Sequence, residues 1–458
     1  MNTIHPRIIR IGAALSVLVA LLAFVARSVQ GQTPPVQRLS LAEAARLAAS
    51  QTAAVQSAQY RVQEAQGRVT QSRSALLPQV GVIPSWTSRT VNSASFGFNF
   101  PAEAGRPPLL DPNGQIIGPV KLYDFRGEAS QSLFDAGALG RVRAARASVT
   151  AANADVATAA EGAAVNAAAI YVRSLRADAT LQARIADSAL ANDLLQIARD
   201  QLEAGVGVAL DVTRAQSRLA ATRSDIIVAR NDRDRSRLEL RRALNLALDT
   251  PLELSDSLGA SLSLPTAGAE QEAVDLAVRT RPDIRAADAQ LAAAEQQAAA
   301  IRATRLPTVG VFGNDGPNGL SFDHLLNTYT YGVQVSWPVF EGKRREGQLQ
   351  EQQAVTRDID VRRRDLRQQI AADVRAAMLD IASAREQMDA ARERQRLAEL
   401  EVEQARDRFR AGVAGNADVI TALVTLNAAR TGMVDALTGY QTARLSLARA
   451  EGTVSQLR

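Results

Sequence analysis

The sequence contains no cysteine, so no disulfide can stabilise the folded chain. Aromatic residues make up 4% of its 458 residues, too few for a large compact core of the usual kind. Glycine and proline, with 28 and 16 copies, are also scarce and collect outside the long helical patterns. What remains is rich in alanine, arginine, glutamine, glutamate and leucine, a composition typical of long helices and coiled coils.

The chain also has only two histidines and a small net charge of +5. Basic and acidic residues number 53 and 48, and three of the basic ones (Arg7, Arg10 and Arg27) lie near the N-terminus. Both signs are interspersed, so nucleic acid is not expected as a partner. His324 is the one histidine beyond residue 31, in a Gly/Asn/Asp-rich segment. Without cysteine or a second histidine, the sequence predicts no enzyme, no metal site and no cofactor.

Residues 1–31 have the pattern of a secretory signal peptide. Arg7 and Arg10 precede an apolar run at 11–26, and small residues follow near Gly31. The run is shorter than the ~20 residues of a membrane-spanning helix. An uncleaved N-terminal anchor is the alternative. Either way the chain is expected to be exported, and without cysteine it is not expected to carry an N-terminal lipid.

A short turn that occurs twice indicates an internal duplication. Gly205 and Asp211 of the first copy correspond to Gly412 and Asp418 of the second at the same spacing. Each turn follows a long helical pattern and opens another, so each is predicted to be the tip of a helical hairpin, with its glycine in a left-handed conformation. Upstream, the pattern Leu-Pro-x-Val-Gly-Val also occurs twice, at 77–82 and 306–311.

The duplication divides the exported chain into two repeats, and the predicted fold class is α+β. The first repeat, 32–245, is expected to hold a helix, a long β-hairpin at 79–133 and a long helical hairpin at 134–245. Its β-hairpin has an insertion of 23 residues relative to the second repeat, with an exposed loop at 100–119. A Ser/Leu/Pro/Gly connector at 246–268 follows. The second repeat, 269–458, has its β-hairpin at 308–339 and its helical hairpin at 340–450.

The last predicted strand has one apolar face. Alternation with small or polar residues is strict at Tyr329, Tyr331, Val333, Val335 and Trp337, as in a strand between lipid and water. Four strands cannot close a barrel, and lipid does not tolerate an open sheet edge. Several chains would therefore have to pool their strands, and a trimer would supply twelve. A soluble hairpin packed on helices is the alternative.

The long helices carry coiled-coil seams of small residues. In the second long helix the seam recurs every seven positions, at Ile370, Ala377, Ala384, Ala391, Ala398 and Ala405. A helix of about 70 residues is ~105 Å long. Such helices suit a ring that continues a channel away from the membrane. A filamentous coiled-coil dimer would show the same period, but it does not account for strands inserted at matching places in both repeats.

In the order and spacing of these features, the chain resembles the TolC family of outer-membrane efflux proteins. The resemblance rests on the two Leu-Pro-x-Val-Gly-Val segments, the helix starts at Phe134-Asp135 and Phe340-Glu341, and the tips at 205–212 and 412–419. It implies a homotrimer, with a twelve-stranded barrel in outer-membrane lipid, an α-helical coiled-coil barrel across the periplasm, and an equatorial belt that includes residues 246–268. It implies the exit channel of a tripartite efflux or type I secretion system.

The resemblance also implies roles for the tips. A periplasmic adaptor protein and an inner-membrane transporter would dock there, and Asp211 and Asp418 would line a pore gate. The residues expected to contact the adaptor are Gly205, Val206, Gly207, Gly412, Val413 and Ala414. For each aspartate a helix N-cap is the alternative, and both roles can coexist. The family has an arginine where this chain has Ala414, and a second carboxylate where it has Thr421, so a closed gate must be held differently here.

A protein of another class could share part of this pattern. A non-channel periplasmic coiled-coil adaptor or scaffold would have the helices, but it has no use for four amphipathic strands. Within the channel class, drugs, metal ions and proteins all remain open as transported substrates.

Overall fold

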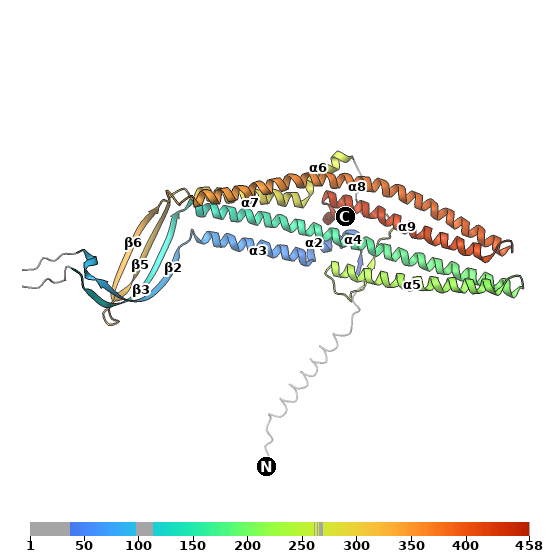
Figure 1. Ribbon diagram of the computed structural model, residues 1–458, viewed down its shortest axis with the longest axis horizontal. Helices are drawn as coiled ribbons and strands as arrows, with labels where there is room; N and C mark the ends of the chain where they lie inside the picture. Colours follow the sequence, from blue (N-terminus) through green and yellow to red (C-terminus); the bar gives the residue numbers. More distant parts are fainter. Residues whose placement is uncertain (1–36, 98–112, 261, 263, 265–268, 458) are drawn as a thin grey trace, which may run out of the picture. The chain divides into compact units, whose positions relative to one another are not determined.

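A computed structural model describes residues 37–97, 113–260, 262, 264 and 269–457 (Figure 1). The predicted signal peptide and most of the predicted loop at 100–119 lie outside these residues. The chain forms two compact units. Of the described residues, the helical unit comprises those within 1–53, 160–276 and 373–458, and the sheet unit comprises those within 54–159 and 277–372. Each unit therefore draws on both sequence repeats.

The described part of the first repeat contains four α-helices. They are α2 (Leu41–Gln51), α3 (Ala53–Ser74), α4 (Ala136–Glu203) and α5 (Ala209–Ala243). Ser40 caps α2, and Glu43 three residues later completes a capping box. Two hydrogen bonds from Ser40 lower the pKa of the Glu43 carboxyl. The helical pattern runs without a break from residue 41 to about 77 and predicts one helix, but Thr52 has an extended backbone and separates α2 from α3.

The second repeat also contains four helices. They are α6 (Glu270–Thr280), α7 (Pro282–Ala303), α8 (Arg344–Arg410) and α9 (Asn416–Glu451). The Arg281-Pro282 pair predicts a break in the helical pattern, and Pro282 occupies the first turn of α7 directly after that break. With 67 residues, α8 is about 100 Å long. Within the described residues, no helix combines the length and apolar character needed to cross a membrane.

The sheet unit contains one antiparallel sheet of four strands, which lie side by side in Figure 1. They are β2 (Gln79–Asn92), β3 (Ile116–Phe134), β5 (Thr308–Gly319) and β6 (Leu326–Ser336). The order is β2-β3-β5-β6, so a strand of the first repeat pairs with one of the second. Among the described residues, β2 and β6 each pair on one side only, and the sheet has two open edges.

The start of β3 corrects the predicted loop. This loop was expected to extend to Pro119, yet the strand begins at Ile116 and includes a cis Gly118-Pro119 bond. The pairing register shifts between Arg89 and Val91 on the neighbouring strand. Proline has no N–H to donate, and such irregular positions accommodate it within a sheet. The glycine and proline, which read as loop residues in the sequence, are part of the strand.

The connector contains a strand that the sequence did not indicate. β4 (Leu252–Leu254) pairs in parallel with β1 (Gln37–Leu39), although the two segments lie more than 200 residues apart. Leu39 and Leu252 are both buried. Three residues are too few for a recognisable alternation, so this pairing depends on tertiary structure.

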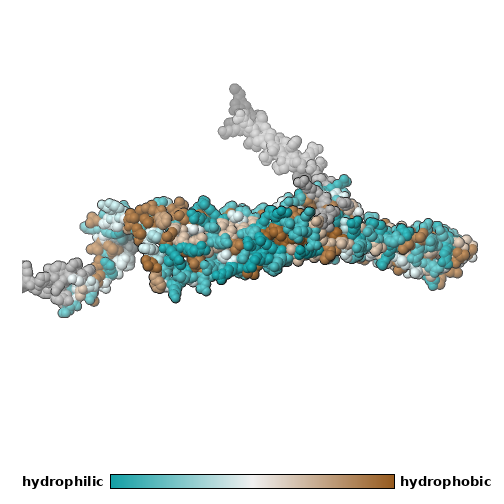
Figure 2. Space-filling model, turned by 90° about the horizontal axis from the view of Figure 1, so that it is seen from above, coloured by the Kyte–Doolittle hydropathy of each residue, from teal (hydrophilic) through white to brown (hydrophobic). Residues whose placement is uncertain are grey.

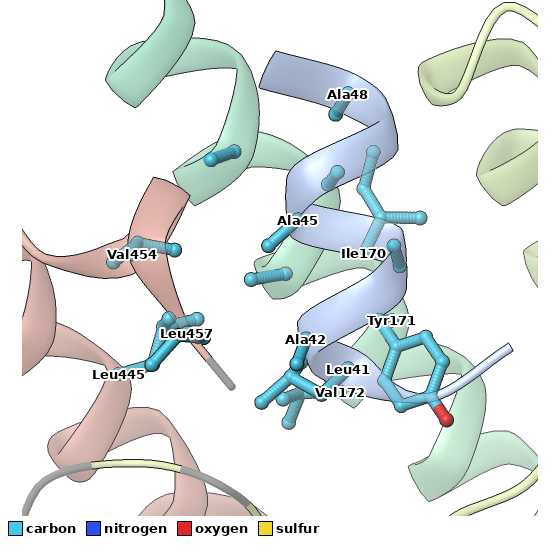
Figure 3. Packing of buried hydrophobic residues seen from close by; sticks show 14 of the residues in the cluster. Leu41, Ala42, Ala45, Ala48, Ile170, Tyr171, Val172, Leu445, Val454 and Leu457 are labelled. Atoms are coloured by element: carbon cyan, nitrogen blue, oxygen red, sulfur yellow. The ribbon is translucent and has the colours of Figure 1, made fainter. Parts of the chain in front are cut away.

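The main core of the helical unit lies around α2. Figure 3 shows Leu41, Ala42, Ala45 and Ala48 of α2 between α4 and the C-terminal residues that carry Val454 and Leu457. Tyr171 of α4 is fully buried, and its hydroxyl lies 2.8 Å from the Leu39 carbonyl oxygen and 2.9 Å from Asp256 Oδ2. Burial, together with the Asp256 carboxylate, raises the pKa of this hydroxyl.

Polar side chains of α9 hold the rest of the connector. Gln441 and Arg444 are buried, and both donate hydrogen bonds to connector carbonyls. The acceptors are the carbonyl oxygens of Leu258, Ala260, Leu262 and Leu264. Irregular backbone in a protein interior needs such donors, because an unpaired buried carbonyl is costly.

A second core joins the two helical hairpins near their tips. Residues of α4, α5, α8 and α9 form one buried cluster that includes Leu194, Leu219, Val402 and Leu426. Of the seam predicted on α8, Ile370, Ala377 and Ala398 are buried, and Ala384, Ala391 and Ala405 are partly buried. The packed residues are mostly alanine, leucine and valine, so the helices approach closely with few aromatic side chains.

Candidate functional site

The two hairpin tips have the same backbone hydrogen bonds. Gly205 and Gly412 have φ values of +73° and +72°, as predicted for left-handed residues at the ends of α4 and α8. Val206 N–H donates to the Gln201 carbonyl oxygen at 3.0 Å, and Val413 N–H to that of Arg408 at 3.1 Å. This is the Schellman arrangement, which satisfies the last carbonyls of each helix.

Two side chains join the tips to each other, and both tips lie at the same end of the helical unit (Figure 1). Gln201 Nε2 donates to the Phe409 carbonyl oxygen at 2.8 Å, and Asn416 Nδ2 donates to that of Asp211 at 2.8 Å. Asn416 is 1% exposed, and its Oδ1 atom has no hydrogen-bond partner. Each tip therefore supplies one amide to the main chain of the other.

Neither Asp211 nor Asp418 is a helix N-cap, so that alternative is wrong. The caps are Val208 and Gly415, and neither uses its side chain. Asp211 and Asp418 lie in the first turns of α5 and α9, where a negative charge still favours the positive end of the helix dipole. Asp211 lies 3.9 Å from Arg214 and its side chain is 18% exposed. Asp418 is exposed and pairs with no cation in the described part of the chain.

The tips also expose apolar side chains. Val206 is 78% exposed and Val413 is 69% exposed, and each follows its left-handed glycine. Val208 and Leu210 extend the exposed apolar surface of the first tip. Gly207 lies close to the preceding helix, because a Cβ at this position would be 2.9 Å from Gln201 Cβ.

The sheet has one apolar face, to which the register assigns residues from all four strands. Val335 pairs with Val309 and Val309 with Phe134, while Val333 pairs with Val311. In the rows beyond, Val80 and Val82 of β2 share this face with Tyr331 and Tyr329. Val333, Val335, Tyr329, Tyr331 and Trp337 are all exposed, and Figure 2 shows hydrophobic residues gathered over the strands.

Aromatic residues mark both ends of this apolar face on β6. Tyr329 and Tyr331 stack with ring centroids 6.0 Å apart. Trp337 follows the other end of the strand, and its indole Nε1 donates to the Arg305 carbonyl oxygen at 3.3 Å. Val333 and Val335 lie between them, which is the order of a lipid-facing strand with aromatic girdles.

The opposite face of the sheet is mostly polar and charged, although Phe312 and Ile83 also lie on it. Arg126 Nε donates to Asp124 Oδ1 at 2.8 Å, and Arg126 also contacts Asn314 Oδ1 of β5 at 3.4 Å. On β6 the residues of this face are Thr330, Gly332, Gln334 and Ser336. His324 lies in the exposed β5–β6 turn, with Nδ1 3.0 Å from Asp323 Oδ2.

Sequence reasoning missed Gln201 and Asn416. Their positions in the other repeat hold Arg408 and Ala209, so both residues break the duplication within a few positions of a tip. That loss of symmetry was the one available signal. Their acceptors are carbonyls on the other hairpin, which periodicity cannot identify.

The model of the outer membrane efflux protein family matches the chain twice, at residues 44–246 and 273–453. No curated protein sequence matches the chain. Among solved structures, VceC of Vibrio cholerae aligns at 19% identity with a TM-score of 0.70, covering 90% of this chain and 96% of that one. CmeC of Campylobacter jejuni aligns at 16% identity with a TM-score of 0.71, covering 90% of this chain and 85% of that one.

The MtrE channel of Neisseria gonorrhoeae, solved in its open state, aligns at 18% identity with a TM-score of 0.68, covering 90% of this chain and 88% of that one. At these identities the structures establish the fold, whereas the family match extends over most of the chain and over both repeats. The chain therefore belongs to the outer membrane efflux protein family, as an outer-membrane exit channel with a large helical periplasmic portion.

Proposed function

We propose that three copies of this chain form a gated exit channel for a tripartite efflux or secretion system. The observation that carries the proposal is the four-stranded sheet with an exposed apolar face and two open edges. Open edges are not tolerated in lipid, so β2 of one copy must pair with β6 of the next. Since β2 and β6 run in opposite directions, this pairing continues the antiparallel order and gives a closed barrel of twelve strands.

The apolar face has the height of a membrane barrel. Trp337 follows Tyr329 by eight positions, about 26 Å along an extended chain at ~3.3 Å per residue. Strands tilted by about 40° would span ~20 Å along the membrane normal, close to the ~25 Å apolar band of such barrels. Tyr329, Tyr331, Val333, Val335 and Trp337 are therefore assigned to the lipid side.

The polar face then lines the lumen. Arg126, Asp124 and Asn314 form a hydrogen-bonded group on this side, where water fills the channel. A buried ion pair in lipid would be costly, whereas in an aqueous lumen it is solvated. On the apolar face, the rows of Tyr331, Val333 and Val335 contain no charged residue, and Asp315 pairs with Tyr329 nearer the β5–β6 turn. This distribution agrees with the direction assigned to the apolar residues.

We assign the gate to the tips at the periplasmic end of the helices. In a trimer, three exposed Asp418 carboxylates would surround a narrow entrance, attract cations and repel one another. Asp211 has a weaker role, because Arg214 partly neutralises it. Both residues lie in first helical turns, so the backbone of the tips fixes their positions.

A closed gate needs contacts between the hairpins. Ala414 replaces the arginine that the TolC family uses near this position, and Gln201 and Asn416 supply other links here. Each donates to a carbonyl on the opposite tip, and each such hydrogen bond stabilises by about 1 kcal/mol. Opening would separate the tips and break both bonds.

We infer that the tips also contact the partners. A periplasmic adaptor and an inner-membrane transporter would meet the surface formed by Gly205, Val206, Gly207, Gly412, Val413 and Ala414. Exposed valines beside glycines offer an apolar surface of the kind that another protein covers. We propose no catalytic residue and no cofactor.

The test is to purify the mature protein from membranes in detergent, measure its oligomeric mass, and record its conductance in planar bilayers. A trimer with a small cation-selective conductance is expected, and Asp418→Ala should lower the cation preference. Asp323→Ala, in the exposed β5–β6 turn far along the chain from the tips, is the control and should leave selectivity unchanged. A soluble monomer or dimer without conductance would instead support a coiled-coil scaffold.

A further inference from the structure

A group of exposed apolar side chains lies where the strands meet the helices of the sheet unit. We call it the collar, and its members are Leu77, Leu133, Phe134, Leu306, Trp337, Val339 and Phe340. Val339 is 76% exposed and Phe340 is 81% exposed, although both are large and apolar. The collar continues the apolar face of the sheet, so the same lipid that covers the strands would cover it.

The loop that presents Val339 and Phe340 is held rigidly. Arg345 is buried, and it donates to the Pro338 carbonyl oxygen at 3.1 Å, to Glu341 Oε2 at 2.9 Å and to Thr304 Oγ1 at 3.2 Å. These bonds tie the loop to the end of α7. The two apolar side chains are thus fixed in an exposed position, which is unlike a loop that could fold them inward.

The first repeat has a similar loop. Leu133 and Phe134 are exposed, and Asp135 Oδ1 accepts from Ala138 N–H at 2.8 Å. The sequence order of two apolar residues followed by a carboxylate is the same in both repeats. The carboxylate anchors the loop to the helix each time, so both repeats present an apolar pair at the same place in the fold.

Below the collar of the second repeat the surface is basic. The exposed basic residues here are Arg302, Arg305, Lys343 and Arg344, and they outnumber the two carboxylates, Glu341 and Glu346. Arg345 also belongs to this group but is buried. Three of the cations are paired, since Arg344 and Arg345 bind Glu341, and Arg305 lies 3.7 Å from Glu346. Arg302 and Lys343 have no ion-pair partner among the described residues, and both are exposed.

Lys343 has an unfavourable backbone. Its φ is +64°, and the structure describes only one other residue besides glycine with positive φ, Asn245. Asparagine and glycine tolerate this conformation better than lysine does. The chain has just two lysines, Lys121 and Lys343. Local folding alone does not explain a lysine here, whereas a need for its charge does.

We propose that the collar and the cations Lys343 and Arg302 bind anionic phospholipid headgroups of the periplasmic leaflet. This inference rests on the proposed orientation, in which the helices extend into the periplasm. Acyl chains cover the apolar collar, and the phosphate groups lie beside the exposed ammonium and guanidinium groups. Each basic residue near an anionic membrane surface raises the binding constant roughly fivefold.

The test uses the full mature protein in detergent, incubated with equal amounts of phosphatidylglycerol and phosphatidylcholine. Native mass spectrometry then measures the ratio of the two lipids that remain bound. The wild type is expected to prefer phosphatidylglycerol, and Lys343→Asn should reduce this preference about fivefold. Adding Arg302→Gln should reduce it again by about as much. Lys343→Arg should retain the preference.

Stability separates binding from folding. Because asparagine tolerates positive φ, Lys343→Asn should unfold at the same temperature as the wild type or higher. The matched control is Lys121→Asn, at the other lysine, which should leave the lipid ratio unchanged. Equal ratios for the wild type and Lys343→Asn, or an equal loss in Lys121→Asn, would overturn the proposal.

The same preparation is recorded in planar bilayers. A trimer that conducts ions but shows no preference for phosphatidylglycerol contradicts only the headgroup site. A protein that neither trimerises nor conducts contradicts the proposed channel itself. The preference for phosphatidylglycerol is expected to be lost in 1 M salt, because the Debye length there is about 3 Å and charges farther apart are screened.

Discussion

The first and second hairpin tips share one backbone conformation but differ in their side chains. Gly205 and Gly412 adopt the same left-handed conformation, and the same two hydrogen bonds follow each of them. Yet Gln201 corresponds to Arg408, and Asn416 corresponds to Ala209. The first tip donates through a residue that precedes its glycine, and the second through a residue that follows it.

This difference shows how a duplicated chain becomes asymmetric at one place. The turn depends on glycine and on local hydrogen bonds, so both copies keep it. Each link between the tips needs a side-chain amide on one tip and an acceptor carbonyl on the other. Tips with identical side chains would place like side chains opposite each other. Divergence at Gln201 and Asn416 supplies two complementary links. The aspartates differ in the same way, since Asp211 is partly paired and Asp418 is exposed.

The largest effect is expected from removing both links. The double variant Gln201→Ala, Asn416→Ala should weaken the contact between the tips by about 2 kcal/mol, or roughly 30-fold in the ratio of closed to open forms. Each single variant should lower the ratio of closed to open forms about fivefold. The measurement is open probability in planar bilayers. Gln196→Ala is the control, because it loses only an exposed hydrogen bond within α4. Unchanged gating in the double variant would show that these links do not hold the gate.

The next effect concerns the two aspartates. Asp418→Asn should lower the ratio of cation to anion permeability about fivefold, since a unit charge about 4 Å away through water contributes ~1 kcal/mol. Asp211→Asn should change the ratio less, because Arg214 lies beside it. Reversal potentials in a salt gradient measure both variants. Asp418→Glu keeps the charge and should keep the ratio. Equal losses in the two Asn variants would contradict the assigned difference.

The glycines test the part that the tips share. Gly205→Ala and Gly412→Ala should each lower the free energy of unfolding by about 1 kcal/mol, because alanine is unfavourable at positive φ. Denaturant unfolding in detergent should give equal values for the two sites. Gly162→Ala is the control within α4, where a Cβ would meet nothing within 4 Å. It should raise stability, since alanine favours helix more than glycine does. Unequal costs at Gly205 and Gly412 would mean that the turns are not equivalent.

The smallest effect is expected from copying one link into the other tip. Ala209→Asn places the residue of the second tip at the matching, exposed position of the first. Stability should change by less than about 0.5 kcal/mol, as for other surface substitutions. Open probability should stay at the wild-type value. A more tightly closed channel would show that the second amide finds an acceptor, and that the tips are more symmetric than their side chains indicate.

Much of the fold could be predicted from local patterns. Glycine in the repeated turns predicted left-handed residues, Pro282 predicted a helix start, and the alternation from Tyr329 to Trp337 predicted a strand with one apolar face. Each depends on residues within a few positions of one another. The break at Thr52 was not predicted, because no glycine or proline marks it and threonine is only mildly unfavourable within a helix. The strand position of Gly118-Pro119 was not predicted, because proline is uncommon within a sheet.

By itself, the sequence determined the duplication, the hairpins, the apolar face of the sheet and the family, because these depend on spacing and periodicity along the chain. Only the tertiary structure decided which residues join the tips, where β1 meets β4, and which cations below the collar lack a partner. Gln201 and Phe409 are 208 residues apart in the sequence. Helical or strand periodicity relates only residues within one element, so it cannot identify this pair. A hydrogen bond between them exists because the two hairpins pack side by side, and that packing brings a side-chain amide within reach of a main-chain carbonyl.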